Sequence, residues 1–262
     1  RMPNATCRSS RSQLPKPSAG DGLYRVAVRP LAAVLLALAL TAACSSSEDD
    51  TSTPEADTTE PADPQEILDA AADGMAAVEG VAFTIDRTGA EVYIDDGENL
   101  AFVSAEGRFG APASADAVVT VELGSATLQV GAVAIDGTIW LTDPVSGSWD
   151  EASESLTFDP ATLFDPEIGW RALLAEDLTD VELVSAEEDV AVLTGVAAAE
   201  RVDVLTGGIV EEAAPVELTI DTEADVISSV EFAVDTDDGV AEWRVDLDSY
   251  GAQVDVTAPP LG

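Results

Sequence analysis

The sequence contains no histidine, only two cysteines and a single lysine in 262 residues. The absence of histidine removes the Ser-His-Asp triad, the most frequent general base and histidine-ligated zinc. Both cysteines, Cys7 and Cys44, lie near the start, so the rest of the chain has neither a disulfide nor a thiol nucleophile. Carboxylates are so numerous that a pair at catalytic spacing would arise by chance. We therefore expect no enzyme, and neither catalytic residues nor a cofactor.

Two acidic stretches resemble parts of calcium loops without completing one. "DTDDG" (235–239) lacks the full spacing of oxygen ligands and the distant bidentate glutamate. "YIDDGEN" (93–99) has the composition of a turn. We interpret both as turns and expect no metal site.

Basic residues are scarce throughout. The chain has 51 acidic and 11 basic residues, for a formal net charge of −40, and Asp21 is the only acid before Cys44. A surface this poor in lysine and arginine cannot neutralise phosphates, which excludes nucleic-acid binding and attraction to anionic headgroups. The acids are spread evenly over the rest of the chain. This favours a general adaptation of the surface to high salt over a local concentration of negative charge that binds a ligand. We hypothesise a salt-tolerant host.

The stretch "VLLALALTAACSSSEDD" changes character at Cys44. Arg25 and Arg29 precede an apolar run of about ten residues, Leu31–Leu40, which is too short to span a membrane as a helix. The sequence "TAAC" that follows resembles a bacterial lipobox, although its threonine stands where an aliphatic residue is commoner. The alternative is an ordinary secretory peptide in which the cysteine is incidental.

The lipobox resemblance predicts three segments. Residues 1–43 form a signal peptide. Residues 1–24 are long for the charged region of such a peptide, which indicates that the true translation start lies further downstream. Residues 44–62 carry acyl chains such as palmitate on Cys44 and form a disordered acidic tether. Residues 63–262 form the folded domain. Two acyl chains anchor a protein stably where one does not, so we expect it on the extracytoplasmic face of the cell membrane.

Hydrophobic periodicity predicts an α+β domain with a mostly antiparallel sheet. A helix is expected from Asp63, with Pro64 at its first position and Gly80 at its end. Two short helices are expected after Asp159-Pro160 and Asp165-Pro166, and another over 197–208. Asp136-Gly137 predicts a type I′ hairpin turn. Strands are expected at 81–86, 99–109, 116–123, 128–135, 138–142, in "DVELVSA" and "DVAVLTGV", and at 216–221, 226–235, 241–251 and 253–259.

Along the late strands one face is apolar and the other acidic, so one face of the sheet meets water and the other meets something apolar. Periodicity does not distinguish a packed core from a space that holds a lipid. If such a space exists, the face assignment gives its candidate lining residues: Leu68, Met75, Val119, Val121, Leu218, Val230, Phe232, Trp243 and Val245.

Four motifs carry a family resemblance: "IDGTIW", "FDPATLFDPEIGW", "PVELTIDTEADVISSVEF" and the closing "YGAQVDVTAPP". Their order resembles the LppX/LprA/LprF/LprG group of actinobacterial lipoproteins and covers about residues 63–260. The chain departs from that group in its acidity and its lack of lysine.

The resemblance implies a curved, mostly antiparallel half-barrel wrapped around helices, with an apolar cavity. It also implies a monomeric, membrane-anchored lipoprotein that binds acylated lipids or glycolipids and carries them within the cell envelope, sometimes together with a membrane lipid exporter. The alternatives are a solute receptor, which usually has two lobes with parallel sheets, and a structural envelope lipoprotein with a solid core and protein partners.

Overall fold

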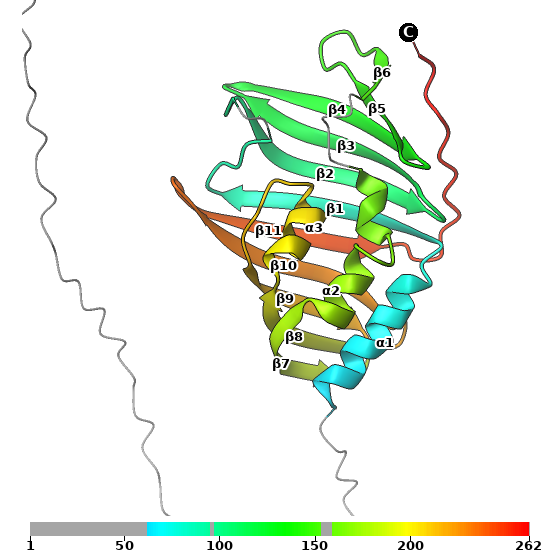
Figure 1. The fold of residues 1–262 in the computed structure, drawn as a ribbon, viewed down its shortest axis with the longest axis vertical. Coiled ribbons are helices and arrows are strands. Elements are labelled where there is room, and N and C mark those ends of the chain that lie inside the picture. Colours follow the sequence, from blue (N-terminus) through cyan, green and yellow to red (C-terminus); the bar gives the residue numbers. More distant parts are fainter. Residues whose placement is uncertain (1–61, 95–96, 153–158, 262) are drawn as a thin grey trace, which may run out of the picture. The chain divides into compact units, whose positions relative to one another are not determined.

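Eleven antiparallel strands form one open, curved sheet in the computed structural model, which describes residues 62–94, 97–152 and 159–261 (Figure 1). The order across the sheet is β6-β5-β4-β3-β2-β1-β11-β10-β9-β8-β7. This confirms the predicted fold class. The strands are β1 (Gly80–Gly89), β2 (Leu100–Gly110), β3 (Ser114–Leu123), β4 (Ala126–Ile135), β5 (Thr138–Thr142), β6 (Trp149–Glu151), β7 (Leu178–Glu187), β8 (Val190–Ala197), β9 (Ala214–Asp221), β10 (Val226–Thr236) and β11 (Gly239–Asp248).

The sheet consists of two meanders, β1–β6 and β7–β11, that join in the middle. The first strand and the last strand of the sequence pair there, with Phe83 opposite Leu247 and Ile85 opposite Val245. The predicted hairpin between β4 and β5 is confirmed, since Asp136 and Gly137 both have positive φ, at 50° and 78°. Side chains alternate between the two faces along most of each strand, with irregularities on β2 near Phe102, on β10 near Ile227 and within β7.

The first helix, α1 (Pro64–Ala76), begins as predicted. The side chain of Asp63 accepts a hydrogen bond from the Gln65 backbone N–H at 2.9 Å, and Pro64 occupies the first turn. The predicted end at Gly80 was wrong, because the helix stops at Ala76 and Gly80 is the first residue of β1. A glycine is needed there for another reason: a Cβ would lie 2.1 Å from the Ala252 carbonyl oxygen.

The two Asp-Pro motifs give one short helix each, with one difference from the prediction. Asp159 caps the 3₁₀ helix η1 (Pro160–Phe164), accepting from the Ala161 N–H at 2.8 Å. Asp165 accepts from the backbone of the next turn, but the helix α2 (Trp170–Glu176) begins only after Gly169. A Cβ on Gly169, the N-cap of α2, would come within 2.2 Å of the Leu163 carbonyl oxygen, so this close approach requires a glycine.

The last two predicted elements have different outcomes. The helix expected over 197–208 is confirmed as α3 (Ala199–Thr206), which Gly207 ends in the left-handed conformation with φ 67°. The strand expected over 253–259 is wrong, since the chain beyond Ser249 is not a strand. Both edges of β1 are already occupied by β2 and β11, so the tail crosses the end of β1 and β2 instead, where its Val254 lies against Gly110.

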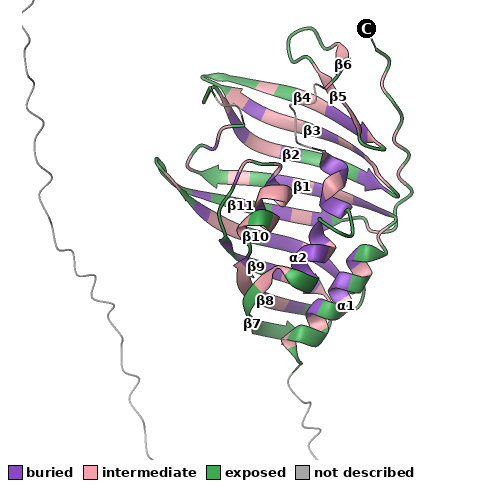
Figure 2. Cartoon of the chain, viewed as in Figure 1, coloured by how far each residue is buried: buried purple, intermediate pink, exposed green. Residues whose placement is uncertain are grey.

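All the helices cover one face of the sheet, and the buried residues lie between the two layers (Figures 1 and 2). On β11, Trp243, Val245 and Leu247 are buried, whereas Glu242 and Arg244 between them are exposed. Tyr250, just after this strand, donates a hydrogen bond from its hydroxyl to the Ile227 carbonyl oxygen, and burial raises the pKa of that hydroxyl.

These residues belong to one compact unit, Asp57–Gly262. The described residues include no helix with the length and hydropathy of a membrane span.

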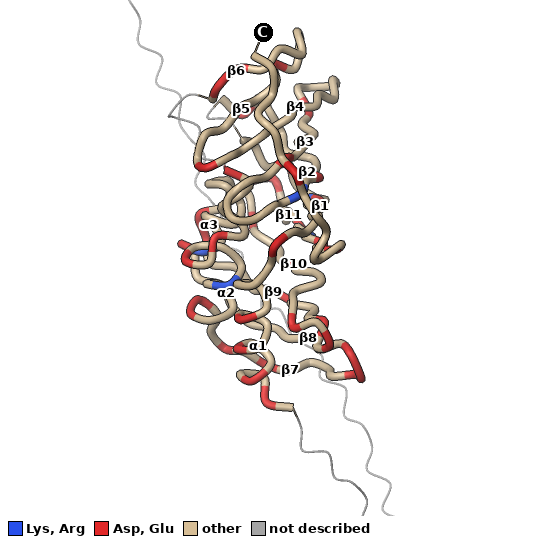
Figure 3. The backbone as a smooth tube through the Cα atoms, turned by 90° about the vertical axis from the view of Figure 1, so that its right-hand side faces the viewer, with Lys and Arg blue, Asp and Glu red and all other residues tan. Residues whose placement is uncertain are grey.

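Acidic residues are distributed along the whole of this unit, with few arginines among them (Figure 3). Their mutual repulsion is screened as the Debye length falls from about 10 Å at 0.1 M salt to about 3 Å at 1 M. We expect the Tm of the unit to rise by about 10 °C or more between about 0.1 M and about 2 M KCl, measured by calorimetry. Sucrose at equal osmolality is the control, because it stabilises only by exclusion from the surface. An equal rise in sucrose would contradict electrostatic screening as the cause.

Candidate functional site

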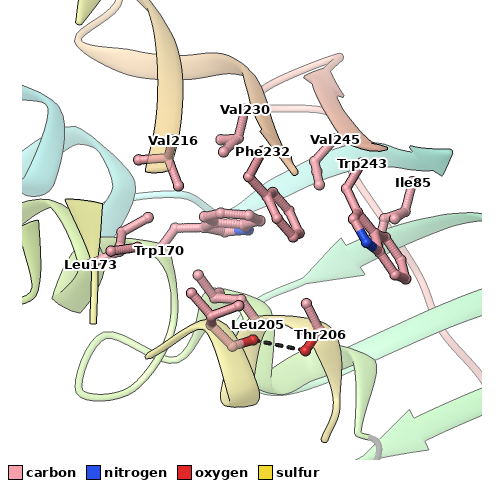
Figure 4. A pocket seen from close by; sticks show the side chains of 12 residues that line it. Ile85, Trp170, Leu173, Leu205, Thr206, Val216, Val230, Phe232, Trp243 and Val245 are labelled. Carbon is pink, nitrogen blue, oxygen red and sulfur yellow. Dashed lines mark hydrogen bonds between the residues drawn. The ribbon is translucent and has the colours of Figure 1, made fainter. Parts of the chain in front are cut away.

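An apolar cavity lies between the inner face of the sheet and the helices α2 and α3 (Figure 4). Its volume is about 30 Å³. The sheet contributes side chains from five neighbouring strands, β1, β11, β10, β9 and β8, and the helices cover them from the other side. The lining residues are Ile85, Trp170, Leu173, Ala197, Val202, Leu205, Thr206, Val216, Val230, Phe232, Trp243 and Val245.

The sheet wall of the cavity is set by strand register. Val230 lies opposite Val245, and Phe232 lies opposite Trp243, so β10 and β11 present two adjacent pairs to the same space. The Trp243 ring stacks between two phenylalanines, with its centroid 5.2 Å from that of Phe102 and 5.8 Å from that of Phe232. This aromatic row gives the cavity a flat apolar wall.

The helix wall is formed by two short helices that are tied to each other. Arg201 at the start of α3 forms an ion pair with the Asp177 carboxylate at the end of α2, to which its Nε donates a hydrogen bond of 2.7 Å, and it donates another hydrogen bond to the Ile168 carbonyl oxygen. Its side chain is only 12% exposed. We call this group of contacts the Arg201 latch. It ties the start of α3 to the end of α2 and to the turn before it.

The one hydroxyl among the lining residues already has a hydrogen-bond acceptor and a donor within the protein. Thr206 donates to the Val202 carbonyl oxygen at 2.8 Å and accepts from the Val210 backbone N–H at 3.0 Å. Its two hydrogen bonds lie within α3 and the loop that follows. The Thr206 hydroxyl therefore adds no free polar group to the cavity.

Two polar groups on the cavity wall are not satisfied. The indole Nε1 atoms of Trp170 and Trp243 are the only buried side-chain nitrogens or oxygens in the described part of the chain that have no hydrogen-bond partner. The two side chains are 2% and 3% exposed, so bulk water does not reach them. A buried donor without an acceptor costs about 1–3 kcal/mol. The cavity thus has an apolar lining that includes two hydrogen-bond donors without acceptors.

The cavity is too small in this state for a lipid. Pockets that hold small molecules measure roughly 300–1,000 Å³, whereas about 30 Å³ is room for one or two water molecules at most. An acyl chain can enter only if the helix layer moves away from the sheet. The side chains that would then surround it are aliphatic and aromatic, which suits hydrocarbon.

A wider hollow of about 590 Å³ lies on the other face of the same strands. Its lining includes Asp86, Glu217, Glu231 and Glu242, with Arg244 among them. These carboxylates make it unsuited to an acyl chain, because charged groups would have to lose their hydration beside hydrocarbon. Of the described residues, no group of acidic side chains has the arrangement of a metal site.

The nine predicted cavity residues divide into two groups. Val230, Phe232, Trp243 and Val245 line the cavity together. Leu68, Met75, Val121 and Leu218 are buried in the surrounding core, and Val119 is partly buried there. Leu68 and Met75 lie on α1. This helix packs on α2 and β10 and contributes no side chain to the cavity. Cys44 falls outside the described residues.

The residues that sequence reasoning missed come mainly from the helices. Trp170 and Leu173 are three residues apart on α2, and Val202, Leu205 and Thr206 have the i, i+3, i+4 spacing on α3. Each pattern marks the face of a helix that packs on a sheet. Helical spacing in "WRALLAE" and "AERVDVLT" was the signal that could have identified them.

Comparison with known proteins gives one family and a number of similar structures, among them LprF and LppX. The family model described as LppX_LprAFG lipoprotein matches residues 63–256. The structure of LprF from Mycobacterium bovis superposes with a TM-score of 0.58 at 16% identity, covering 76% of this chain and 97% of that one. LppX from Mycobacterium tuberculosis gives 0.52 at 16% identity, with 74% and 98% covered. At this identity the two structures establish the fold alone. No curated protein sequence matches the chain.

Proposed function

The chain belongs to the LppX_LprAFG lipoprotein family, and we propose that it is a membrane-anchored carrier that takes up acylated lipids or glycolipids in the cavity under α2 and α3. The observation that supports this best is the cavity itself, in which side chains from five strands and two helices surround an apolar space. A solute receptor would need polar groups in that space to bind its ligand.

The energetics suit a carrier that exchanges with a membrane. Moving acyl chains out of water is favourable by about 0.8 kcal/mol for each methylene buried. Moving them between a bilayer and an apolar cavity changes little, because both surroundings are hydrocarbon. Uptake and release are therefore both feasible, and the rate depends on how readily the helix layer opens.

We expect the cavity to open by movement of α3 away from the sheet. This helix has only eight residues and is followed by Gly207 and Gly208, both with positive φ. Besides its apolar underside, it is held by the Arg201 latch, by a backbone hydrogen bond from its N-cap Ala198 to the Asp177 carbonyl oxygen, and by packing on η1. A lipid that displaced α3 would reach Val230, Trp243 and Val245 on the sheet beneath.

Breaking the Arg201 latch is expected to speed lipid exchange. Arg201→Gln removes the ion pair with Asp177, a partly exposed interaction worth about 1 kcal/mol, so uptake and release should both accelerate about fivefold. The measurement is the transfer of a fluorescent phospholipid from donor to acceptor vesicles. Arg108→Gln is the matched control, because it breaks the exposed pair with Asp116 on β2 and β3, far from α3. Unchanged transfer by the Arg201 variant would show that the cavity opens elsewhere.

The remaining parts of the proposal concern the anchor and the partners. Lipidated Cys44 would hold the protein on the extracytoplasmic face of the membrane, and residues 45–62 would tether the domain within reach of it. A monomer is sufficient, since one chain supplies every wall of the cavity. A membrane lipid exporter would be the source or the recipient of the lipid.

The test of the carrier function is native mass spectrometry on Asp57–Gly262, exported to a bacterial envelope and then extracted with organic solvent. We expect a stoichiometric mass increment that extracts as an acyl lipid. A bare mass, unchanged after incubation with bacterial membrane lipids, would overturn the carrier function in favour of a solid-core envelope lipoprotein. A bound polar solute without lipid would favour a receptor.

A further inference from the structure

The two unsatisfied indole donors have a common location. Trp170 comes from α2 and Trp243 from β11, which are far apart in sequence, yet both rings line the same cavity. In Figure 4 the nitrogen of each ring lies on the side that faces the other indole, with Phe232 between them. The remaining buried polar side-chain atoms of the described chain all have partners. The unused donors are therefore concentrated where a ligand would lie.

The chemistry of these donors restricts what could satisfy them. An indole N–H donates and never accepts, so its partner must be an acceptor. The lining set holds no second free polar group, because the Thr206 hydroxyl is engaged with Val202 and Val210. A ligand hydroxyl or amide would therefore bring its own donor into a space whose one acceptor, the Thr206 oxygen, already accepts a hydrogen bond from Val210. A ligand carboxylate or phosphate would be buried without any lining lysine or arginine.

An ester carbonyl meets all these conditions, since it has acceptor lone pairs, no donor and no charge. An ether oxygen also lacks a donor and a charge, but it lies between two alkyl groups, whereas a carbonyl oxygen projects from the chain toward a donor in the wall. We propose that Trp170 and Trp243 donate hydrogen bonds to the ester carbonyl oxygens of a bound acyl lipid and thereby select ester-linked over ether-linked chains. This inference rests on the proposed lipid-binding function. It adds specificity within the cavity, where hydrocarbon alone would not distinguish one long-chain molecule from another.

The test compares two lipids that differ only in these carbonyls. Lipid-free Asp57–Gly262 is offered an equimolar mixture of 1,2-dioleoylglycerol and the diether 1,2-di-O-oleylglycerol, both delivered from cyclodextrin. Native mass spectrometry resolves the two complexes in one sample, so their ratio does not depend on how much protein is active. We expect the ester complex to exceed the ether complex about tenfold, which corresponds to about 1.4 kcal/mol.

Substitutions then locate the preference. Trp170→Phe and Trp243→Phe keep an aromatic ring and remove only the donor, so each should reduce the ester preference about threefold and together they should abolish it. Binding of the diether should not weaken in either variant. Trp140→Phe is the matched control, because Trp140 lies on β5 outside the cavity and should leave the ratio unchanged.

A spectroscopic readout separates hydrogen bonding from packing. In ¹⁵N-labelled protein the indole N–H resonances of Trp170 and Trp243 should shift downfield with the diester and not with the diether. Equal binding of the two lipids by the unmodified protein, or indole shifts of equal size with both, would overturn the ester assignment while leaving the carrier function intact. Binding of neither lipid would overturn both.

Discussion

Replacement of Cys44 by serine is expected to release the protein from the membrane completely. The thiol is the only group at the predicted lipobox that can take the diacylglycerol, and serine offers a hydroxyl of nearly the same size. Each acyl chain contributes about 0.8 kcal/mol for every methylene buried, so two chains anchor stably and none leaves a highly acidic protein that membranes repel. We expect Cys44→Ser to move from the detergent phase to the aqueous phase in cloud-point partitioning and to lose incorporation of labelled palmitate.

Cys7→Ser is the control for this result. Cys7 lies within residues 1–43, which are expected to be removed with the signal peptide, so this variant should stay fully anchored and labelled. Membrane retention of Cys44→Ser without palmitate would mean that the apolar run at 31–40 anchors the chain by itself. The tether and the extracytoplasmic location would then need another explanation.

The faces of the sheet could be predicted from the sequence because they depend only on alternation along each strand. Trp243, Val245 and their neighbours on β11 follow from the period of two, whatever the rest of the chain does. The same holds for the Asp136-Gly137 turn, whose geometry is fixed by the two residues that form it.

The position of the cavity on the apolar face could not be predicted in this way. Val230 and Leu218 are directly opposite each other on β10 and β9 and share the same face. Val230 lines the cavity, whereas Leu218 is buried in closed packing beside it. The difference depends on which inner side chains meet a helix from the other layer. That depends on where α2 begins, which is directly after the close approach of Gly169 to Leu163.

The unsatisfied indoles are a further feature that only the structure provides. Trp170 and Trp243 are ordinary core residues in the sequence, and nothing in their local patterns predicts that their N–H groups lack acceptors. Satisfaction of a buried donor depends on groups brought together from distant segments. Local sequence rules therefore give the fold class and the apolar face of this domain, and tertiary packing gives its candidate chemistry.

Enlarging one side chain in the cavity is expected to abolish lipid binding with little loss of stability. In Val230→Phe the added ring occupies the space under α2 and α3, so the acyl chain must displace it as well as the helix layer. We expect lipid occupancy, measured by native mass spectrometry after loading, to fall at least about tenfold. Because the cavity of about 30 Å³ accepts part of the ring, the free energy of unfolding should fall by no more than about 1 kcal/mol.

Val234→Phe is the matched control, since Val234 lies four positions along β10 on the same face and outside the cavity. The same enlargement there meets packed side chains and should cost about 1–3 kcal/mol of stability. Its lipid occupancy should stay close to that of the unmodified protein, because the space under α3 is untouched. Val230→Phe should thus lose lipid binding and keep its stability, whereas Val234→Phe should lose stability and keep lipid binding. Equal loss of lipid in both would mean that binding follows general stability of the domain, and the cavity beside Val230 would not be the site.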